Sequence, residues 1–203
     1  MKDFWNERYN DNEWAYGKEP NAYIKEKLPL FNAGKVLFPA EGEGRNAVYA
    51  ATLGWNVSAF DYSLKGKEKA DKLAQLNNVT IDYKVQAFLD EKYKQDEFDM
   101  ICLTSVHFEP KIKAEMHKRL DNYLKKGGYI ILEAFSKEHR EINKKNPKVG
   151  GPSSEEEMYS LEEIKRDFSN YEIIELKNKN TYLQEGLYHI GNSAVIRFIG
   201  KKK

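Results

Sequence analysis

An apolar segment, a turn with two glycines and a helical segment follow one another near residue 40, and they limit the fold more than any other feature. Val36–Ala40 is apolar, Gly42-Glu43-Gly44 follows, and the helical pattern from Asn46 to Leu53 ends before Gly54. A strand that passes into a helix through such a turn is typical of parallel sheets with helices on both faces. Backbone N–H groups at the start of that helix would face a ligand.

Asp61 ends the next apolar segment, one strand further along the chain than Glu41. A carboxylate at the tip of the second strand can accept hydrogen bonds from both ribose hydroxyls of a nucleoside-containing cofactor. Glu41 and Glu43 stand in the turn itself, where their charges would repel a pyrophosphate. The two carboxylates suit a ligand with a sulfonium and an ammonium group, so the pattern favours S-adenosylmethionine (SAM) over a dinucleotide. For Glu43, simple exposure to solvent is the alternative.

The spacing of apolar segments and helical patterns predicts one α/β domain over residues 1–203. We expect a Rossmann-like, doubly wound, mostly parallel seven-stranded sheet that ends in an antiparallel hairpin. Residues 1–30 are expected to form an N-terminal helical cover, and the polar stretch 136–158 a lid or substrate loop without regular structure. The predicted strands are Val36–Ala40, Val57–Phe60, Thr80–Val85, Phe98–Ser105, Tyr129–Phe135, Glu172–Leu176 and Ser193–Ile199; helices are predicted after Pro20, Ser63 and Ser160, and from Pro110 to Gly127-Gly128.

Composition excludes several classes of partner. Thirty-three Lys and Arg nearly balance 32 Asp and Glu, so the net charge of +1 gives no electrostatic reason to expect nucleic acid or an anionic membrane as partner. The single cysteine, Cys102, lies in an apolar run and cannot form an internal disulfide. With no leader and no apolar run of membrane-spanning length, we expect a cytoplasmic protein.

At these residues the chain resembles the class I SAM-dependent methyltransferases. The resemblance covers nearly the whole chain. Within the class, the chain more specifically resembles the tellurite-resistance and thiopurine methyltransferase-like branch. The segments that carry it are Trp5–Tyr9, Tyr16–Asn21, Val36–Ala47, Asp61-Tyr62-Ser63, His107, Gly151-Pro152 and Tyr188-His189.

The resemblance implies an enzyme that transfers a methyl group from SAM to a small-molecule acceptor, possibilities being a thiol or a metalloid. It implies no metal, and it leaves the acceptor and the oligomeric state open. The cofactor-binding residues that it implies are Ala40, Glu41, Gly42, Gly44, Asp61, Tyr62, Ser63, Gln86, Ala87, Phe88 and Thr104. Phe38, Ala40 and Ala87-Phe88 depart from the family pattern, so adenine specificity is expected to rest on backbone groups.

No catalytic residue can be assigned, because a soft nucleophile needs no general base whereas a hydroxyl or amine does. The candidates for the pocket are His107, His189, Tyr16 and Glu133. Glu133 either faces the pocket or pairs with a cation such as Arg45, and the remaining histidines, His117 and His139, are expected on the surface. Two alternative functions stay open: an NAD(P)-dependent oxidoreductase on a similar sheet, and a non-catalytic SAM-binding protein.

Overall fold

The computed structural model describes residues 2–90 and 92–203, and these fall into two compact units. The first unit contains residues up to Tyr93 together with Glu185–Leu187, and the second contains Lys94–Gln184 and Tyr188–Lys203. Seven strands of the described residues form a sheet in the order β3-β2-β1-β4-β5-β7-β6. The expected mostly parallel, seven-stranded α/β sheet with antiparallel C-terminal strands is therefore confirmed.

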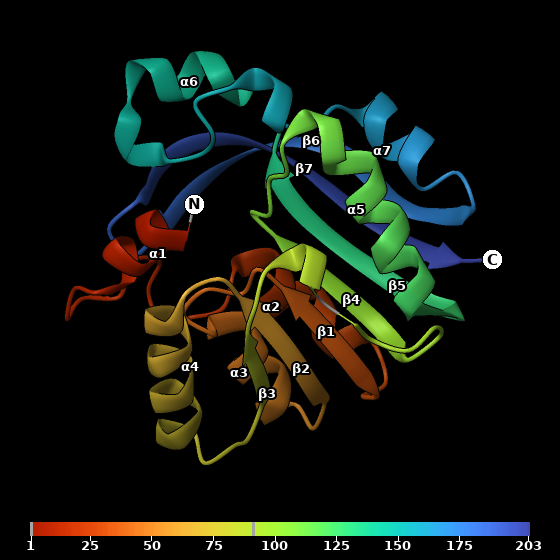
Figure 1. Cartoon of the computed structure of the whole chain (residues 1–203). Helices are drawn as coiled ribbons and strands as arrows, with labels where there is room; N and C mark the ends of the chain where they lie inside the picture. Colours follow the sequence, from red (N-terminus) through yellow and green to blue (C-terminus); the bar gives the residue numbers. More distant parts are fainter. Residues whose placement is uncertain (1, 91) are drawn as a thin grey trace. The chain divides into compact units, whose positions relative to one another are not determined.

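The described residues of the first unit form three parallel strands and four α-helices (Figure 1). Its sheet register places Pro39 opposite Phe60, and Asp61 opposite Val85. The end of β1, which precedes the glycine turn, and the end of β2 at Asp61 therefore lie at the same edge of this unit's strands. The elements are α1 Lys2–Tyr9, α2 Ala22–Lys27, β1 Lys35–Pro39, α3 Arg45–Thr52, β2 Asn56–Asp61, α4 Leu64–Leu76 and β3 Asp82–Val85, with 3₁₀ helices at Leu28–Leu30 and Phe88–Asp90.

The apolar β1 segment forms the centre of this unit's core. Val36, Leu37 and Phe38 are fully buried, as a strand covered on both faces requires. Pro39 is the last residue of β1, where the absence of an N–H group costs no ladder bond in the strand interior. Ser63 caps α4 through its hydroxyl, which accepts a hydrogen bond from Gly66 N at 3.0 Å, so the predicted helix start is confirmed.

The second unit carries the other four strands and three α-helices. β4 and β5 run parallel, whereas β5 and β7 are antiparallel. Figure 1 shows α5 along β5. The elements are β4 Phe98–Thr104, α5 Pro110–Tyr123, β5 Leu124–Phe135, α6 His139–Lys145, α7 Leu161–Asp167, β6 Tyr171–Glu185 and β7 His189–Lys202, with 3₁₀ helices at Pro147–Val149 and Glu155–Glu157.

The helix before β5 ends earlier than its sequence predicts. α5 stops at Tyr123, and β5 begins at Leu124 rather than at Tyr129. Gly127 has a φ of 76° and lies within β5, where the register against β4 shifts. The glycines therefore accommodate an irregularity in the strand and do not terminate the helix.

Two further expectations about secondary structure were wrong. The stretch 136–158 was expected to lack regular structure, but it contains α6 and two 3₁₀ helices and buries Val149 and Met158 completely. Its role as a lid or substrate loop stays a prediction. β6 and β7 are also far longer than predicted, with 15 and 14 residues. β6 lies at the edge of the sheet and most of its residues are exposed, so the alternation of apolar and polar residues that reveals a strand is missing.

The glycine turn supplies a test of the packing between α3 and α4. Gly44 has a φ of 83°, and a Cβ added there would lie 2.5 Å from the Cβ of Ala70. Gly54 has a similar φ of 87° with no atom within 4 Å of an added Cβ. We expect Gly54→Ala to lower the free energy of unfolding by about 1–2 kcal/mol through backbone strain, and Gly44→Ala to lower it by about 1–3 kcal/mol more through overpacking. Urea denaturation measures both variants, and equal losses would contradict the packing argument.

Candidate functional site

Asp61 lies directly against the glycine turn. Its Oδ2 accepts a hydrogen bond from Gly42 N at 3.0 Å, and its Oδ1 accepts one from Ser63 N at 2.9 Å. The side chain is only 6% exposed, and this burial raises the pKa of Asp61, although the backbone N–H groups partly oppose the shift. The structure therefore brings together three of the predicted cofactor residues, Asp61, Gly42 and Ser63.

Two tyrosines enclose Gly42. The hydroxyl of Tyr83 donates to Gly42 O at 2.6 Å. A Cβ added to Gly42 would lie 2.6 Å from the hydroxyl of Tyr9, so α1 reaches the turn from the N-terminal cover. Burial, followed by the charge of Asp61, raises the pKa of both tyrosines well above its ordinary value. Both hydroxyls therefore stay protonated.

Glu41 caps the helix that follows the turn. Its Oε1 accepts hydrogen bonds from Asn46 N and Ala47 N, both at 2.8 Å. The residue as a whole is half-buried, but its carboxylate is enclosed, and this burial raises the pKa of Glu41 to about 7. A carboxylate at this end of α3 is also favoured by the helix dipole.

Glu43 and Arg45 hold the N-terminal segment. The carboxylate of Glu43 accepts hydrogen bonds from Ala15 N at 3.1 Å and Tyr16 N at 3.2 Å, and it pairs with Lys69 at 2.7 Å. Arg45 donates to Tyr16 O at 3.1 Å. Glu43 is 3% exposed, so the alternative that it is solvated was wrong. The sequence carries no local signal for these bonds, because the partners lie 26 or more residues away.

Gln86 is the next candidate along the sheet edge. Its backbone N donates to Asp61 O at 2.9 Å, which places the residue beside the turn's partner acid. Its side-chain Nε2 is buried and has no hydrogen-bond partner among residues 2–90 and 92–203. Phe88 packs edge to face on Phe60, with ring centroids 5.2 Å apart. Ala87 lies between Gln86 and Phe88 in the sequence, and its carbonyl oxygen accepts a hydrogen bond from Asp90 N.

The remaining predicted cofactor residues have a less specific environment. Tyr62 follows Asp61 and is half-buried. Ala40 follows β1 with a φ of 50°, a conformation that side chains other than glycine rarely adopt. Thr104 ends β4 in the second unit, and its buried Oγ1 has no partner within the described part of the chain. Ser105, next to it, also has a positive φ, of 54°. Such strain persists only where the surrounding structure imposes it.

His107 bonds to the backbone through both ring nitrogens. Phe135 N donates to its Nε2 at 3.4 Å, so the tautomer has the proton on Nδ1, which donates to Glu157 O at 3.1 Å. Burial lowers the pKa of His107 to about 3. His189 is buried as well, and its ring meets Phe135 edge to face at 5.3 Å. His107 is thus a neutral link between β5 and the segment that precedes Tyr159.

The expectation that His117 and His139 lie on the surface was wrong. His139 is fully buried: it stacks on Phe135 at 4.2 Å and interacts with Gly150 O at 3.1 Å. His117 is 1% exposed, and its Nδ1 lies 2.9 Å from Asp167. For His117 the sequence did contain a signal of burial. At helical spacing His117 shares one face of α5 with three other buried residues, which are Lys113, Met116 and Leu120.

Glu133 pairs with Arg197 at 2.6 Å, its register partner on β7. Arg45 instead pairs with Glu185 at 2.9 Å. The alternative that Glu133 pairs with a cation is therefore confirmed, but Arg45 as that cation was wrong, because the sequence did not show which strand lies beside β5. Tyr16 is half-buried, and its hydroxyl accepts a hydrogen bond from Arg8 at 3.4 Å.

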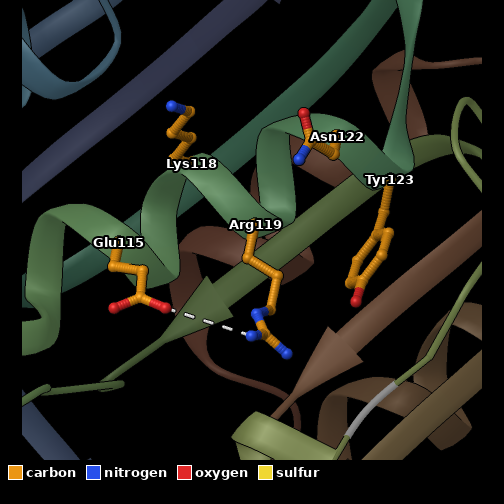
Figure 2. Close-up of a pocket in the computed structure, with 5 residues that line it drawn as sticks. All are labelled: Glu115, Lys118, Arg119, Asn122 and Tyr123. Carbon is orange, nitrogen blue, oxygen red and sulfur yellow. Dashed lines mark ion pairs between the residues drawn. The ribbon is translucent and has the colours of Figure 1, made fainter.

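Two surface hollows are lined by none of these candidate residues. One, of about 360 Å³, is lined by side chains of α5 alone (Figure 2). Glu115 and Arg119 form an ion pair at 4.0 Å, and Lys118 points away from both (Figure 2). The hollow is therefore a shallow depression between charged side chains of one helix. The other, of about 380 Å³, is lined by Ile142, Asn180, Thr181, Tyr182, Asn192 and Ser193.

The described part of the chain contains no group of three or more His, Cys, Asp or Glu side chains that could hold a metal ion. Within residues 2–90 and 92–203, no helix combines the length and the apolar character that crossing a membrane requires.

The buried His107 predicts a dependence of stability on pH. The folded protein keeps this histidine neutral down to about pH 3, whereas the unfolded chain binds a proton near pH 6.5. His107 therefore contributes stability above pH 6.5 that is lost as the pH falls towards 3. We expect the free energy of unfolding to fall less steeply between pH 6.5 and about 4 in His107→Asn than in the wild type. Equal slopes in urea titrations at several pH values would refute the assignment.

Residues 36–128 match the family model described as a methyltransferase domain. No curated protein sequence matches the chain. The chain is similar to a solved structure whose description names the conversion of a disulfide bond into a thioacetal group during echinomycin biosynthesis. The two chains are 16% identical with a TM-score of 0.77, and the match covers 100% of this chain and 92% of that chain. TehB from Haemophilus influenzae is 18% identical, with a TM-score of 0.73, over 100% and 67%. A SAM-dependent methyltransferase from Methanosarcina mazei is 17% identical, with a TM-score of 0.71, over 91% and 98%. At these identities the likeness shows that the chain has the Rossmann-like methyltransferase fold.

Proposed function

We propose that this chain is an enzyme that transfers a methyl group from SAM to a small-molecule acceptor. The observation that carries the proposal is the carboxylate of Asp61, which lies at the end of β2 and bonds to the glycine turn through Gly42 N. The match of residues 36–128 to a methyltransferase domain supports the same conclusion. SAM is the cofactor that this match and the fold lead us to expect.

The residues around the turn fit an adenosyl group. A carboxylate offers about four acceptor positions, and the backbone N–H groups of Gly42 and Ser63 use two of those of Asp61. The remaining capacity suits a ribose hydroxyl. The buried Nε2 of Gln86, which lacks a partner in the described part of the chain, is a donor for the nucleoside. The full proposed set is Ala40, Glu41, Gly42, Gly44, Asp61, Tyr62, Ser63, Gln86, Ala87, Phe88 and Thr104.

The side chains of the second unit favour an acceptor that needs no general base. When bound, SAM supplies an electrophilic methyl group on a positively charged sulfur. His107 and His139 each use both ring nitrogens in hydrogen bonds, and Glu133 pairs with Arg197. Orientation of the acceptor is then the main contribution of the protein. A soft nucleophile such as a thiol or a metalloid reacts under these conditions, whereas a hydroxyl would need a base.

We further propose that the chain is a single methyltransferase domain of the tellurite-resistance and thiopurine methyltransferase-like branch, and that it acts in the cytoplasm. The likeness to TehB from Haemophilus influenzae, whose TM-score is 0.73, supports the branch. In this proposal the N-terminal cover closes the cofactor site and residues 136–158 line the acceptor. The packing of Tyr9 against Gly42 supports the role of the cover.

Removal of the Asp61 charge tests the cofactor site. Asn keeps an oxygen that can accept from the backbone, but it loses the charge-assisted bond to ribose. We expect Asp61→Asn to weaken SAM binding by about 1.5–3 kcal/mol, that is about 10- to 150-fold in Kd. Asp82→Asn, at the exposed start of β3, is the matched control. Isothermal titration calorimetry measures both, and an unchanged Kd in folded Asp61→Asn would argue strongly against this site.

The methyl group itself can be followed to the acceptor. We expect protein and methyl-labelled SAM, mixed with a metabolite extract and pools of thiols and chalcogen oxyanions, to give one labelled small molecule in mass spectrometry. A label that stays on SAM in every pool, amines and quinones included, would favour a non-catalytic SAM-binding protein. A nicotinamide cofactor that copurifies with the protein would favour the oxidoreductase.

A further inference from the structure

The tip of the β6–β7 hairpin, Glu185–Leu187, belongs by its contacts to the first unit. The side chain of Glu185 is only 10% exposed. Its Oε2 accepts from Arg45 Nη2 at 2.9 Å, and its Oε1 accepts from Asn21 Nδ2 at 3.0 Å. Arg45 is the first residue of α3, directly after the glycine turn. One buried carboxylate therefore joins the hairpin tip to the turn and to the N-terminal cover.

The next two residues of the tip, Gly186 and Leu187, contact the backbone of the N-terminal cover. Leu187 N donates to Ala15 O at 2.8 Å. Gly186 has a φ of 58°, and a Cβ added there would lie 2.5 Å from Gly17 N and 2.6 Å from Tyr16 Cα. Because backbone atoms cannot move aside as a flexible side chain does, only glycine fits at this contact.

The same short segment is also held by residues in and directly after the glycine turn. Glu43 accepts hydrogen bonds from Ala15 N and Tyr16 N, and Arg45 donates to Tyr16 O. The backbone groups of Ala15 and Tyr16 are therefore bound both by the hairpin tip and by Glu43 and Arg45.

An aromatic contact connects the segment Ala15–Gly17 with Tyr9, which packs against Gly42. The ring of Tyr16 meets that of Tyr9 edge to face, with centroids 6.4 Å apart. Tyr9 also stacks on Trp5 at 5.5 Å, and its hydroxyl lies against Gly42. A displacement of Ala15–Gly17 would therefore loosen Tyr9 at the turn where the cofactor is proposed to bind.

We propose that the hairpin tip is a latch that holds the N-terminal cover against the glycine turn and thereby sets the affinity for the cofactor. The effect of the latch on cofactor affinity rests on the proposed function. That the hairpin tip holds the N-terminal cover does not depend on that function. If only molecules with a closed cover bind the cofactor, the apparent affinity equals the intrinsic affinity multiplied by the fraction of molecules in which the cover is closed. Glu185 is then a positioning residue, since it acts through Arg45, Asn21 and the cover.

The neutral variant Glu185→Gln tests the latch. We expect its Kd for SAM to rise about 10-fold and its amides in residues 2–21 to exchange faster with deuterium in the absence of SAM. Glu175→Gln is the matched control, because Glu175 lies on the same strand and pairs with Lys177 at 3.2 Å on that strand. The control should keep both the wild-type Kd and the wild-type exchange. An unchanged Kd and unchanged exchange in Glu185→Gln would overturn the proposal.

A second pair of variants separates the latch from a general loss of stability. Gly186→Ala and Gly54→Ala carry the same type of backbone strain, but only the former meets atoms of the cover. We expect faster exchange in residues 2–21 for Gly186→Ala alone, and equal exchange in the two variants would contradict the latch. If the wild type fails to bind SAM, the proposed function is wrong, and the exchange measurement still decides whether the hairpin tip holds the cover.

Discussion

The hydrogen bond between Gly42 N and the carboxylate of Asp61 is the interaction on which the rest of the site depends. It joins the turn after β1 to the end of β2, and Tyr83 on β3 adds a bond to the carbonyl of the same glycine. Three neighbouring strands are thus tied to one residue. Because the register of parallel strands sets where these bonded residues lie, the geometry of the turn follows from the sheet and not from local propensity.

The polar side chains of the turn serve the protein more than a ligand. Glu41 caps α3, and Glu43, Arg45 and Asn46 bind the backbone of the N-terminal cover. Buried charges are tolerated only when such partners compensate for lost hydration. In the first unit, the backbone of the turn, Asp61 and Gln86 keep capacity for a cofactor. The same division explains why a turn with two glutamates is compatible with a folded core.

Buried histidines of the second unit follow the same rule. His107 and His139 are held by backbone groups around Phe135, and burial lowers the pKa of both. A neutral imidazole whose two nitrogens are engaged organises a loop and does not readily remove a proton. The environment at the end of β5 therefore suits chemistry in which the protein orients an acceptor, which agrees with the proposed transfer to a soft nucleophile.

Because parallel strands end at the same edge of a sheet, the sequence could predict that Asp61 lies beside the glycine turn. The sequence alone also determined the fold class and the positions of β1, α3, β2 and α4. These features depend on neighbours along the chain: apolar runs, the Ser63 cap and glycines at positive φ. It missed the length of β6, the partners of Glu133 and Arg45, and the burial of His117 and His139. Only the tertiary structure decided these, because each depends on a residue that is distant in the chain and adjacent in space. A side chain's charge and size are local, but the group that neutralises or covers it is chosen by packing.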